Sequence, residues 1–262
     1  HIRKILKKYT DLFAHYVNGK TVAIVGPANS VVGTNRGSLI DKFDIIIRLN
    51  KALPIPKKLM HDIGSRTDII YNALNTTDFP GQNILDTNFY KQNGVKFVVS
   101  PYPLANVFFN DIMNYIQRYQ FDIPFRTVDT GKYNKFTQQI KTRPYTGTSA
   151  IMDMLSFNIK ALYITGIDFY NTPYYSQYRR VNKKKLLGLR ENAVHLAYPQ
   201  MEFLLYRSLT DNRVLLDNTL EKLLYNQYIK FTNLINNVDL NRVLHTNNNQ
   251  FLNFFNFQPN IL

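Results

Sequence analysis

The chain has 262 residues, enough for one large domain or two small ones, and its apolar share of 45% is that of a folded protein. Lys and Arg number 32 against 18 Asp and Glu, so the net charge of +14 favours an anionic partner: a sugar nucleotide, a nucleic acid, an acidic glycan or a membrane surface. The chain has no cysteine, which excludes disulfides, thiolate chemistry and cysteine-based zinc fingers.

Targeting features are scarce in this sequence. No apolar run approaches the roughly 18–20 residues of a membrane span, and no signal peptide is visible. The lack of cysteine favours a reducing compartment. We therefore expect a soluble fragment without disulfides, compatible with the cytoplasm. Because the chain begins with His1 and not Met, a membrane anchor or targeting segment upstream stays open.

An amphipathic helix is predicted at the amino end, over Ile2 to Asn18, with lysines on its opposite face. Its predicted apolar face consists of Ile5, Tyr9, Leu12, Phe13 and Tyr16. We expect residues 1–19 to pack as a helix on a domain of residues 20–235. An Asn- and Phe-rich tail follows over 236–262, and no pattern assigns it a structure.

Short apolar runs rich in β-branched residues alternate with helical patterns after this first helix. The predicted strands are 21–25, 44–49, 68–71, 95–100, 127–129, 161–164 and 213–216, and the predicted helices are 108–119, 148–157, 192–208 and 218–231. This alternation predicts an α/β fold with a mainly parallel, doubly wound sheet. Ligands of such sheets bind beyond the carboxyl ends of the strands, and Asn50, Asn72 and Asp168 follow three of these strands.

A loop rich in glycine and small polar residues follows the first strand, and a second such group, over 146–148, begins a helix. Backbone N–H groups in these positions can approach a phosphate closely. The candidate nucleotide contacts are Gly26, Asn29, Ser30, Thr146, Gly147 and Thr148. An ordinary strand–loop–helix unit stays open as the alternative, because neither GxGxxG nor GxxxxGK[ST] is present.

Residues 171–190 differ in character from the rest, because tyrosines there alternate with a dense basic run. This composition predicts a lid segment over a binding site. A solvated basic loop is the alternative interpretation of the lysines.

Several ordered motifs resemble those of sialyltransferases and together cover roughly residues 20 to 217. The matching positions are Val25-Gly26, Gly33, Gly37, Ile40-Asp41, Ile47 to Asn50 and Asp62 to Thr67 for the large sialyl motif, and Pro144 to Gly147 and Ala161 to Gly166 for the small one. These motifs are those of glycosyltransferase family 29. The ending Gly166 to Tyr170, and Arg143, are closer to the bacterial sialyltransferases of family 42. The resemblance implies a single Rossmann-like domain, a variant of the GT-A fold.

The sequence departs from the family 29 pattern at defined positions. Pro27 replaces the asparagine that follows the first-strand glycine, so that Asn29 or Ser30 would have to take over its contact. Val22 stands where the family has the first cysteine of its disulfide. Gln200 stands where the family has a glutamate, five residues after the histidine. The family's acceptor rules therefore do not transfer.

The resemblance implies an inverting transfer of sialic acid from a cytidine monophosphate (CMP) donor to a glycan hydroxyl. The acceptor hydroxyl then needs a general base with a pKa near neutrality, and the order of the motifs favours His195 over an ordinary helical histidine. The leaving phosphate needs hydrogen-bond donors, which Tyr170 and one of Tyr174 or Tyr175 would supply, as in the bacterial family. The alternative is that these rings only pack.

No Asp-x-Asp motif is present, so no metal cofactor is expected. Arg143 can pair with a carboxylate or phosphate of the donor, or form a surface ion pair. Asp168 can accept from a sugar or base, or orient its loop. The expected partners are a nucleotide-sugar donor, a glycan acceptor and a peripheral membrane surface, while nucleic acid has no motif support. Two alternatives stay open: another activated sugar at the same site, and a non-catalytic module that binds acidic glycans.

Overall fold

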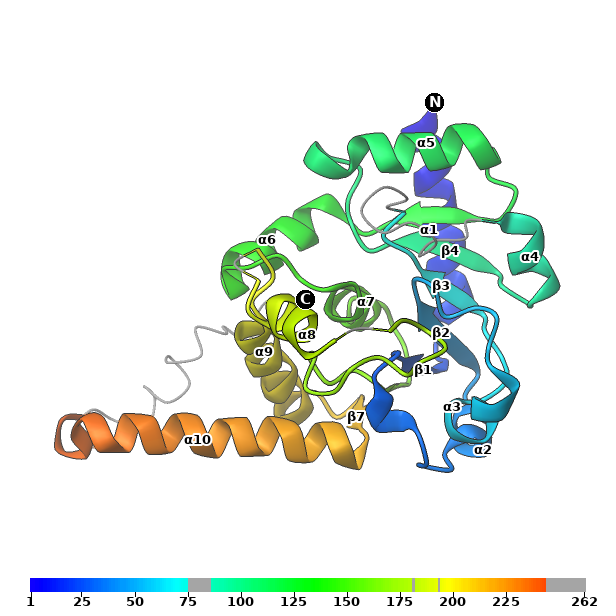
Figure 1. Ribbon diagram of the computed structural model, residues 1–262. Helices are drawn as coiled ribbons and strands as arrows, with labels where there is room; N and C mark the ends of the chain where they lie inside the picture. The colour runs from blue at the N-terminus through cyan, green and yellow to red at the C-terminus, as the bar shows by residue number, and fades with distance from the viewer. Residues whose placement is uncertain (75–85, 181, 193, 244–262) are drawn as a thin grey trace.

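A computed structural model describes residues 1–74, 86–180, 182–192 and 194–243 of the chain (Figure 1). Its centre is a parallel sheet of seven strands in the order β5-β4-β3-β2-β1-β6-β7. The strands are β1 Thr21–Val25, β2 Ile45–Leu49, β3 Ile69–Tyr71, β4 Phe97–Ser100, β5 Phe125–Thr127, β6 Ala161–Thr165 and β7 Val214–Leu216.

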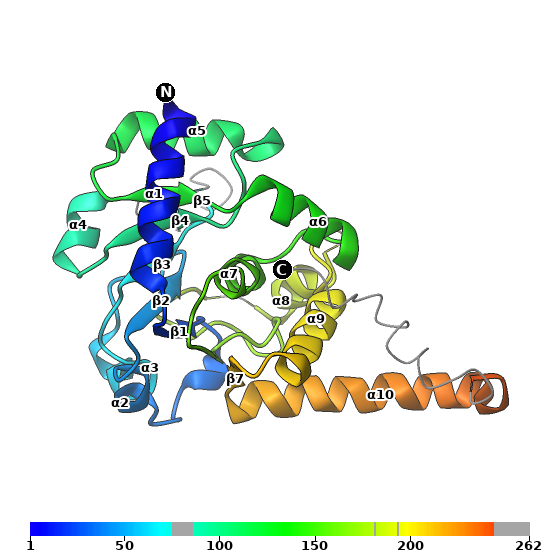
Figure 2. The same ribbon diagram turned by 180° about the vertical axis from the view of Figure 1, so that it is seen from behind.

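Helices cover both faces of this sheet. They are α1 Ile2–Val17, α2 Gly37–Ile40, α3 Met60–Ile63, α4 Thr87–Gln92, α5 Phe109–Tyr119, α6 Thr130–Ile140, α7 Thr146–Leu155, α8 Lys183–Arg190, α9 Ala197–Thr210 and α10 Asn218–Val243. Of the described helices, none is both long and apolar enough to span a bilayer. Figures 1 and 2 show α10 running away from the body of the domain.

Two hydrophobic cores result from the alternation of side chains along the strands. In β1, Val22 and Ile24 belong to one core, which also takes in side chains of α1, α6, α7, α9 and α10. Ala23 and Val25 belong to the other core, with side chains of α2, α3, α4 and α5. Figure 2 shows α1 lying across the strands on the first of these faces. The side chains of the central strands β2, β3 and β4 are all buried, which explains why these strands are nearly continuous apolar runs.

The strand order reverses between β1 and β6, because the chain winds outward from β1 to β5 and then crosses back to β6. The loops after these two strands meet through Gly26 and Gly166. A Cβ atom on Gly26 would lie 2.2 Å from the Gly166 carbonyl oxygen, and one on Gly166 would lie 2.3 Å from that of Gly26. Gly166 also has a φ of 67°. Only glycine fits this contact, which forms the floor of the crevice at the switch point.

Polar residues of the large motif hold the loops beside the sheet together. Arg48, only 1% exposed, donates to the carbonyl oxygens of Ile63 at 2.8 Å and Gly64 at 3.2 Å. Burial lowers the pKa of Arg48 to about 10, so the guanidinium stays charged at neutral pH. Asp62 accepts from the backbone N–H groups of Gly33 and Asn35 at 2.8 Å each. Much of the motif therefore stabilises the fold and lies away from the crevice.

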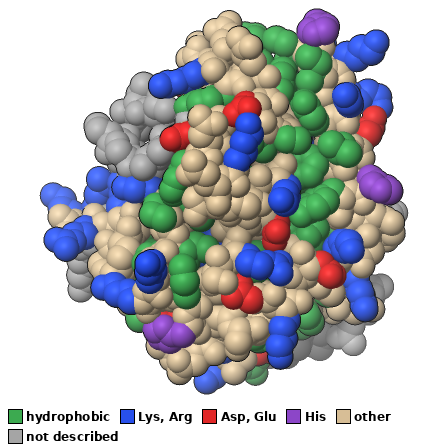
Figure 3. Space-filling view, turned by 90° about the vertical axis from the view of Figure 1, so that its right-hand side faces the viewer, with side chains coloured by type: hydrophobic (Ala, Val, Ile, Leu, Met, Phe, Trp, Pro, Cys, Tyr) green, Lys and Arg blue, Asp and Glu red, His purple; other side chains and the backbone are tan. Residues whose placement is uncertain are grey.

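The predicted doubly wound α/β fold is confirmed, with corrections in its details. The predicted apolar face of α1 was wrong at Leu12, which is 45% exposed, because Leu6 and Val17 turn inward instead. Helix α6 was not predicted, and α8 is regular within the predicted lid. The tail predicted from residue 236 begins inside α10, and its residues from 244 on lie outside the described ones. Figure 3 shows Lys and Arg side chains spread over one face, interspersed with acidic and apolar ones.

Candidate active site

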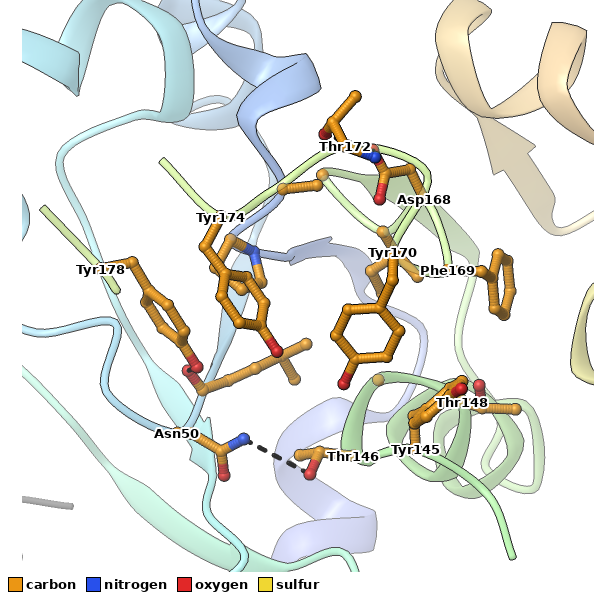
Figure 4. A pocket seen from close by; sticks show the side chains of 16 residues that line it. Asn50, Tyr145, Thr146, Thr148, Asp168, Phe169, Tyr170, Thr172, Tyr174 and Tyr178 are labelled. Atoms are coloured by element: carbon orange, nitrogen blue, oxygen red, sulfur yellow. Dashed lines mark hydrogen bonds between the residues drawn. The ribbon is translucent and has the colours of Figure 1, made fainter. Parts of the chain in front are cut away.

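A pocket opens at the switch point between β1 and β6 (Figure 4). Its walls come from the loop after β1, the end of β2, the first turn of α7 and the segment after β6. The lining residues are Pro27, Ala28, Leu49, Asn50, Tyr145, Thr146, Gly147, Thr148, Gly166, Ile167, Asp168, Phe169, Tyr170, Thr172, Tyr174 and Tyr178. The pocket therefore joins segments that are far apart in the sequence.

The amino end of α7 forms one wall of the pocket. Tyr145 precedes the helix without a side-chain cap, and the first N–H groups of a helix have no partner within it. The Thr148 hydroxyl, which belongs to a residue only 1% exposed, has no hydrogen-bond partner among the residues that the structure describes. Asn50 donates to the Thr146 hydroxyl at 3.4 Å. Unsatisfied donors at a helix amino end favour a negatively charged ligand group.

Three tyrosines face this helix end across the pocket. In Figure 4 the hydroxyls of Tyr170 and Tyr174 point into the space above Thr146. The rings of Tyr170 and Tyr174 meet edge to face at 5.8 Å, and those of Tyr174 and Tyr178 lie 4.9 Å apart. Burial raises the pKa of each of the three phenols, so all three stay protonated at neutral pH. The pocket thus holds neutral O–H donors opposite the helix amides.

The segment after β6 is held in a sharp turn that orients Tyr170. Asp168 accepts from the backbone N–H of Thr172 at 3.0 Å and from its hydroxyl at 2.5 Å. Phe169 and Tyr170 have φ values of 53° and 62°, which are strained for residues with side chains. Burial raises the pKa of Asp168, but its hydrogen bonds to Thr172 favour the ionised form. Asp168 thus orients its loop, as one of the two predicted alternatives had it.

His195 lies outside the pocket lining and contacts Tyr145, which belongs to the lining. Its imidazole stacks on the Tyr145 ring with centroids 5.5 Å apart, and the Tyr145 hydroxyl donates to its backbone oxygen at 2.6 Å. Nδ1 lies 2.9 Å from the Arg143 carbonyl oxygen. A carbonyl only accepts, so Nδ1 carries the proton and Nε2 keeps its lone pair. Burial holds the pKa of His195 below its usual 6.5, and the ring is neutral at neutral pH.

Half of the predicted site residues line this pocket and half do not. Those in the lining are Asn50, Thr146, Gly147, Thr148, Asp168, Tyr170 and Tyr174. Those outside it are Gly26, Asn29, Ser30, Asn72, Arg143, Tyr175 and His195. Gly26 packs beneath the pocket against Gly166, and Asn29 and Ser30 bond through their N–H groups to Pro173 and Thr172.

Two of the predicted contacts are buried in the fold instead. Tyr175 is 3% exposed and packs in the second core, because its backbone is paired with Pro27 and turns the ring away from the pocket. Asn72 is completely buried and donates to the Tyr90 hydroxyl at 3.2 Å. Arg143 lies with its guanidinium 5.1 Å from the centre of the Phe108 ring.

Tyr145 and Tyr178 line the pocket but were not predicted as parts of the site. Tyr178 is four residues after Tyr174, a spacing that puts both on one side of a helical turn, and Tyr178 N–H bonds to the Tyr175 carbonyl in such a turn. Tyr145 directly precedes the helix start that was singled out. No group of three His, Asp or Glu side chains in the described part of the chain is arranged to hold a metal ion.

A parallel sheet whose switch-point crevice exposes a helix amino end is the arrangement of Rossmann-like, nucleotide-dependent enzymes. The model of glycosyltransferase family 29 (sialyltransferase) matches residues 5–152, more than half of the chain, and the chain belongs to this family of glycosyltransferases. A comparison of the sequence with curated proteins found no match.

Solved sialyltransferase structures share the fold at low sequence identity. A mammalian sialyltransferase in complex with Gal-β-1-3GalNAc-ortho-nitrophenol superposes with a TM-score of 0.51 at 13% identity, over 83% of this chain and 79% of that one. Sialyltransferase CstII from Campylobacter jejuni, in complex with the substrate analogue CMP-3FNeuAc, superposes with a TM-score of 0.50 at 14% identity, over 75% of this chain and 81% of that one. Mammalian and bacterial enzymes thus show the same architecture.

Proposed function

We propose that the chain transfers sialic acid from CMP-sialic acid to a hydroxyl of a glycan acceptor, with inversion and without a metal ion. The observation that carries the proposal is the pocket in which the amino end of α7 faces protonated tyrosines. Membership of the sialyltransferase family supports the reaction class. The complexes of similar folds with a CMP-sugar analogue and with a disaccharide support the two substrate classes.

In this proposal the donor's phosphate lies at the amino end of α7. The first amides of the helix and the free Thr148 hydroxyl donate to it. As the bond from the anomeric carbon to the phosphate oxygen breaks, the negative charge on the phosphate grows. Tyr170 and Tyr174 then donate more strongly, which is stabilisation of the transition state by oriented dipoles. Tyr174 takes the role expected of Tyr175.

His195 acts as the general base. The acceptor oxygen attacks the anomeric carbon from the side opposite the phosphate, and its proton passes to Nε2, the nitrogen that keeps its lone pair in the assigned tautomer. The lowered pKa keeps the imidazole neutral and able to accept at neutral pH. Tyr145, which lines the pocket and stacks on the imidazole, fixes the base relative to the donor. Arg143, which supplies the carbonyl behind the ring, is suited to pair with a substrate carboxylate nearby.

A transfer and donor-hydrolysis assay tests the proposal, with CMP-sialic acid, with and without chelator. We expect cleavage that is insensitive to the chelator. His195→Ala should lower kcat about 10²–10⁴-fold, the usual cost of losing a general base. His15→Ala, which removes an imidazole from the surface of α1, is the matched control and should keep full activity. No cleavage of CMP-sialic acid would refute the donor, and a His195→Ala rate within about tenfold of the parent would refute the base.

A second candidate keeps the site but uses another nucleotide sugar. The observation in its favour is Pro27, which lines the pocket where the family has an asparagine. Cleavage of a uridine or guanosine diphosphate sugar in the same assay, faster than that of CMP-sialic acid, would support it.

A further inference from the structure

Gln200 is a buried polar residue that the mechanism above does not use. It lies in the first turn of α9 and is 0% exposed. It stands five residues after His195, at the position where the family motif has a glutamate.

The side-chain amide of Gln200 links three backbone groups. Its oxygen accepts from the N–H of Tyr145 at 2.8 Å. Its nitrogen donates to the carbonyl oxygen of Leu196 at 2.9 Å and, more weakly, to that of Arg143 at 3.4 Å. A neutral amide can both accept and donate, whereas a carboxylate can only accept. Glutamine can make all three of these hydrogen bonds, whereas glutamate could make only the one in which the side chain accepts.

Two of these three backbone groups belong to the site. The Arg143 carbonyl that Gln200 contacts is also the acceptor for Nδ1 of His195, at 2.9 Å. Tyr145, whose N–H Gln200 binds, precedes α7, lines the pocket and stacks on the imidazole. The Gln200 amide thus contacts both the Arg143 carbonyl, which binds the imidazole of His195, and the residue before α7, the helix that forms the pocket wall.

We propose that Gln200 is a positioning residue, which holds the imidazole of His195 and the first turn of α7 in one rigid unit. The spacing between the base and the donor phosphate is then fixed before the acceptor arrives. This inference rests on the proposed role of His195.

A negative charge introduced at position 200 should change the pKa of His195. A purely structural role of Gln200 predicts no such change. Arg143 is the charged group that acts on the imidazole of His195, and the Tyr145 ring stacks on it. Tyr170 and Arg190 act in turn on the Tyr145 hydroxyl. The amide adds no charge to this set. A carboxylate in its place would accept from Tyr145 N–H and put a negative charge beside the imidazole, which favours the protonated ring.

The test follows the imidazole by NMR in three variants, with the His195 signal assigned by its loss in His195→Ala. In Gln200→Glu we expect the apparent pKa of His195 to rise by about half a unit or more, and the acid limb of the kcat profile to move with it. In Gln200→Met, which cannot hold either backbone segment, we expect kcat to fall at least about tenfold. The control Glu202→Gln removes a carboxylate two residues further along α9, on the side that faces α10, and should change neither quantity.

An unmoved His195 titration in folded Gln200→Glu, or a kcat of Gln200→Met within about threefold of the parent, would overturn the proposal. The CMP-induced rise in melting temperature reports whether each variant is folded. If His195→Ala stays active, the proposed base is wrong, while the NMR titration still measures the contact between Gln200 and the imidazole. The two failures are therefore distinguishable.

Discussion

Replacing Tyr170 by phenylalanine removes one hydroxyl from the pocket and keeps the ring. The ring meets Tyr145 edge to face at 4.9 Å and Tyr174 at 5.8 Å, and both contacts survive in Tyr170→Phe. We therefore expect the free energy of unfolding to change by no more than about 1 kcal/mol. The loss should appear in catalysis, because the hydroxyl donates to the charge that develops on the phosphate.

How far kcat falls in Tyr170→Phe depends on the hydroxyl of Tyr174. Removing one such donor typically costs about 10²–10³ in kcat. The Tyr174 hydroxyl points into the same space as that of Tyr170, so Tyr174 can still donate in the variant. We expect the lower end, about 10²-fold or about 2.7 kcal/mol, with KM for the donor little changed.

Steady-state kinetics of Tyr170→Phe, Tyr174→Phe and the double variant measure this effect. The double variant should lose more than the product of the two single losses, because neither hydroxyl is then left to compensate. A kcat of Tyr170→Phe within about threefold of the parent would show that the hydroxyl does not act on the transition state.

Three further predictions concern the floor, the helix end and the base. Gly166→Ala should lower the free energy of unfolding by at least about 2 kcal/mol in urea titrations, since its φ of 67° disfavours a side chain and the new Cβ would lie 2.3 Å from the Gly26 oxygen. Thr148→Val removes a hydroxyl that has no hydrogen-bond partner in the described part of the chain, so stability should stay within about 0.5 kcal/mol while calorimetry shows the Kd for CMP rising about fivefold. Because burial holds the folded-state pKa of His195 below 6.5, the acid limb of the kcat/KM profile should lie at a lower pH than the titration of a free imidazole. The free energy of unfolding should begin to fall at about pH 6.5, where the unfolded chain takes up the proton first, and should stop falling once the pH is below the folded-state pKa.

The sheet could be predicted from the sequence because the side chains of its central strands β2, β3 and β4 are all buried, on one face or the other. A run such as Ile45 to Leu49 then has no polar alternation to obscure it, and its neighbours follow from the βαβ alternation. Helix α6 was missed because polar residues fill most of its sequence. The start of α6 does carry a signal in the sequence, because Asp is a favoured N-cap residue, and Asp129 caps the helix by accepting from the Lys132 N–H at 2.8 Å.

Only part of the site could be predicted from the sequence. The ends of strands can be located from the sequence, but the direction in which a side chain points in an irregular segment cannot be predicted. Asn50 and Asn72 both follow strands, yet Asn50 reaches the pocket and Asn72 turns into the fold. The choice between Tyr174 and Tyr175 depended on the bridge between residue 174 and Ala28, a pairing across 146 residues that no local pattern reveals.

In the proposed function, the switch-point pocket binds a cytidine nucleotide. Melting curves with CMP, uridine diphosphate and guanosine diphosphate test it most directly. At a concentration of about 100 Kd, CMP should stabilise the folded chain by about 2.7 kcal/mol, which raises Tm by about 5–10 °C for a domain of this size. A larger rise with either diphosphate, or none with CMP, would contradict the account.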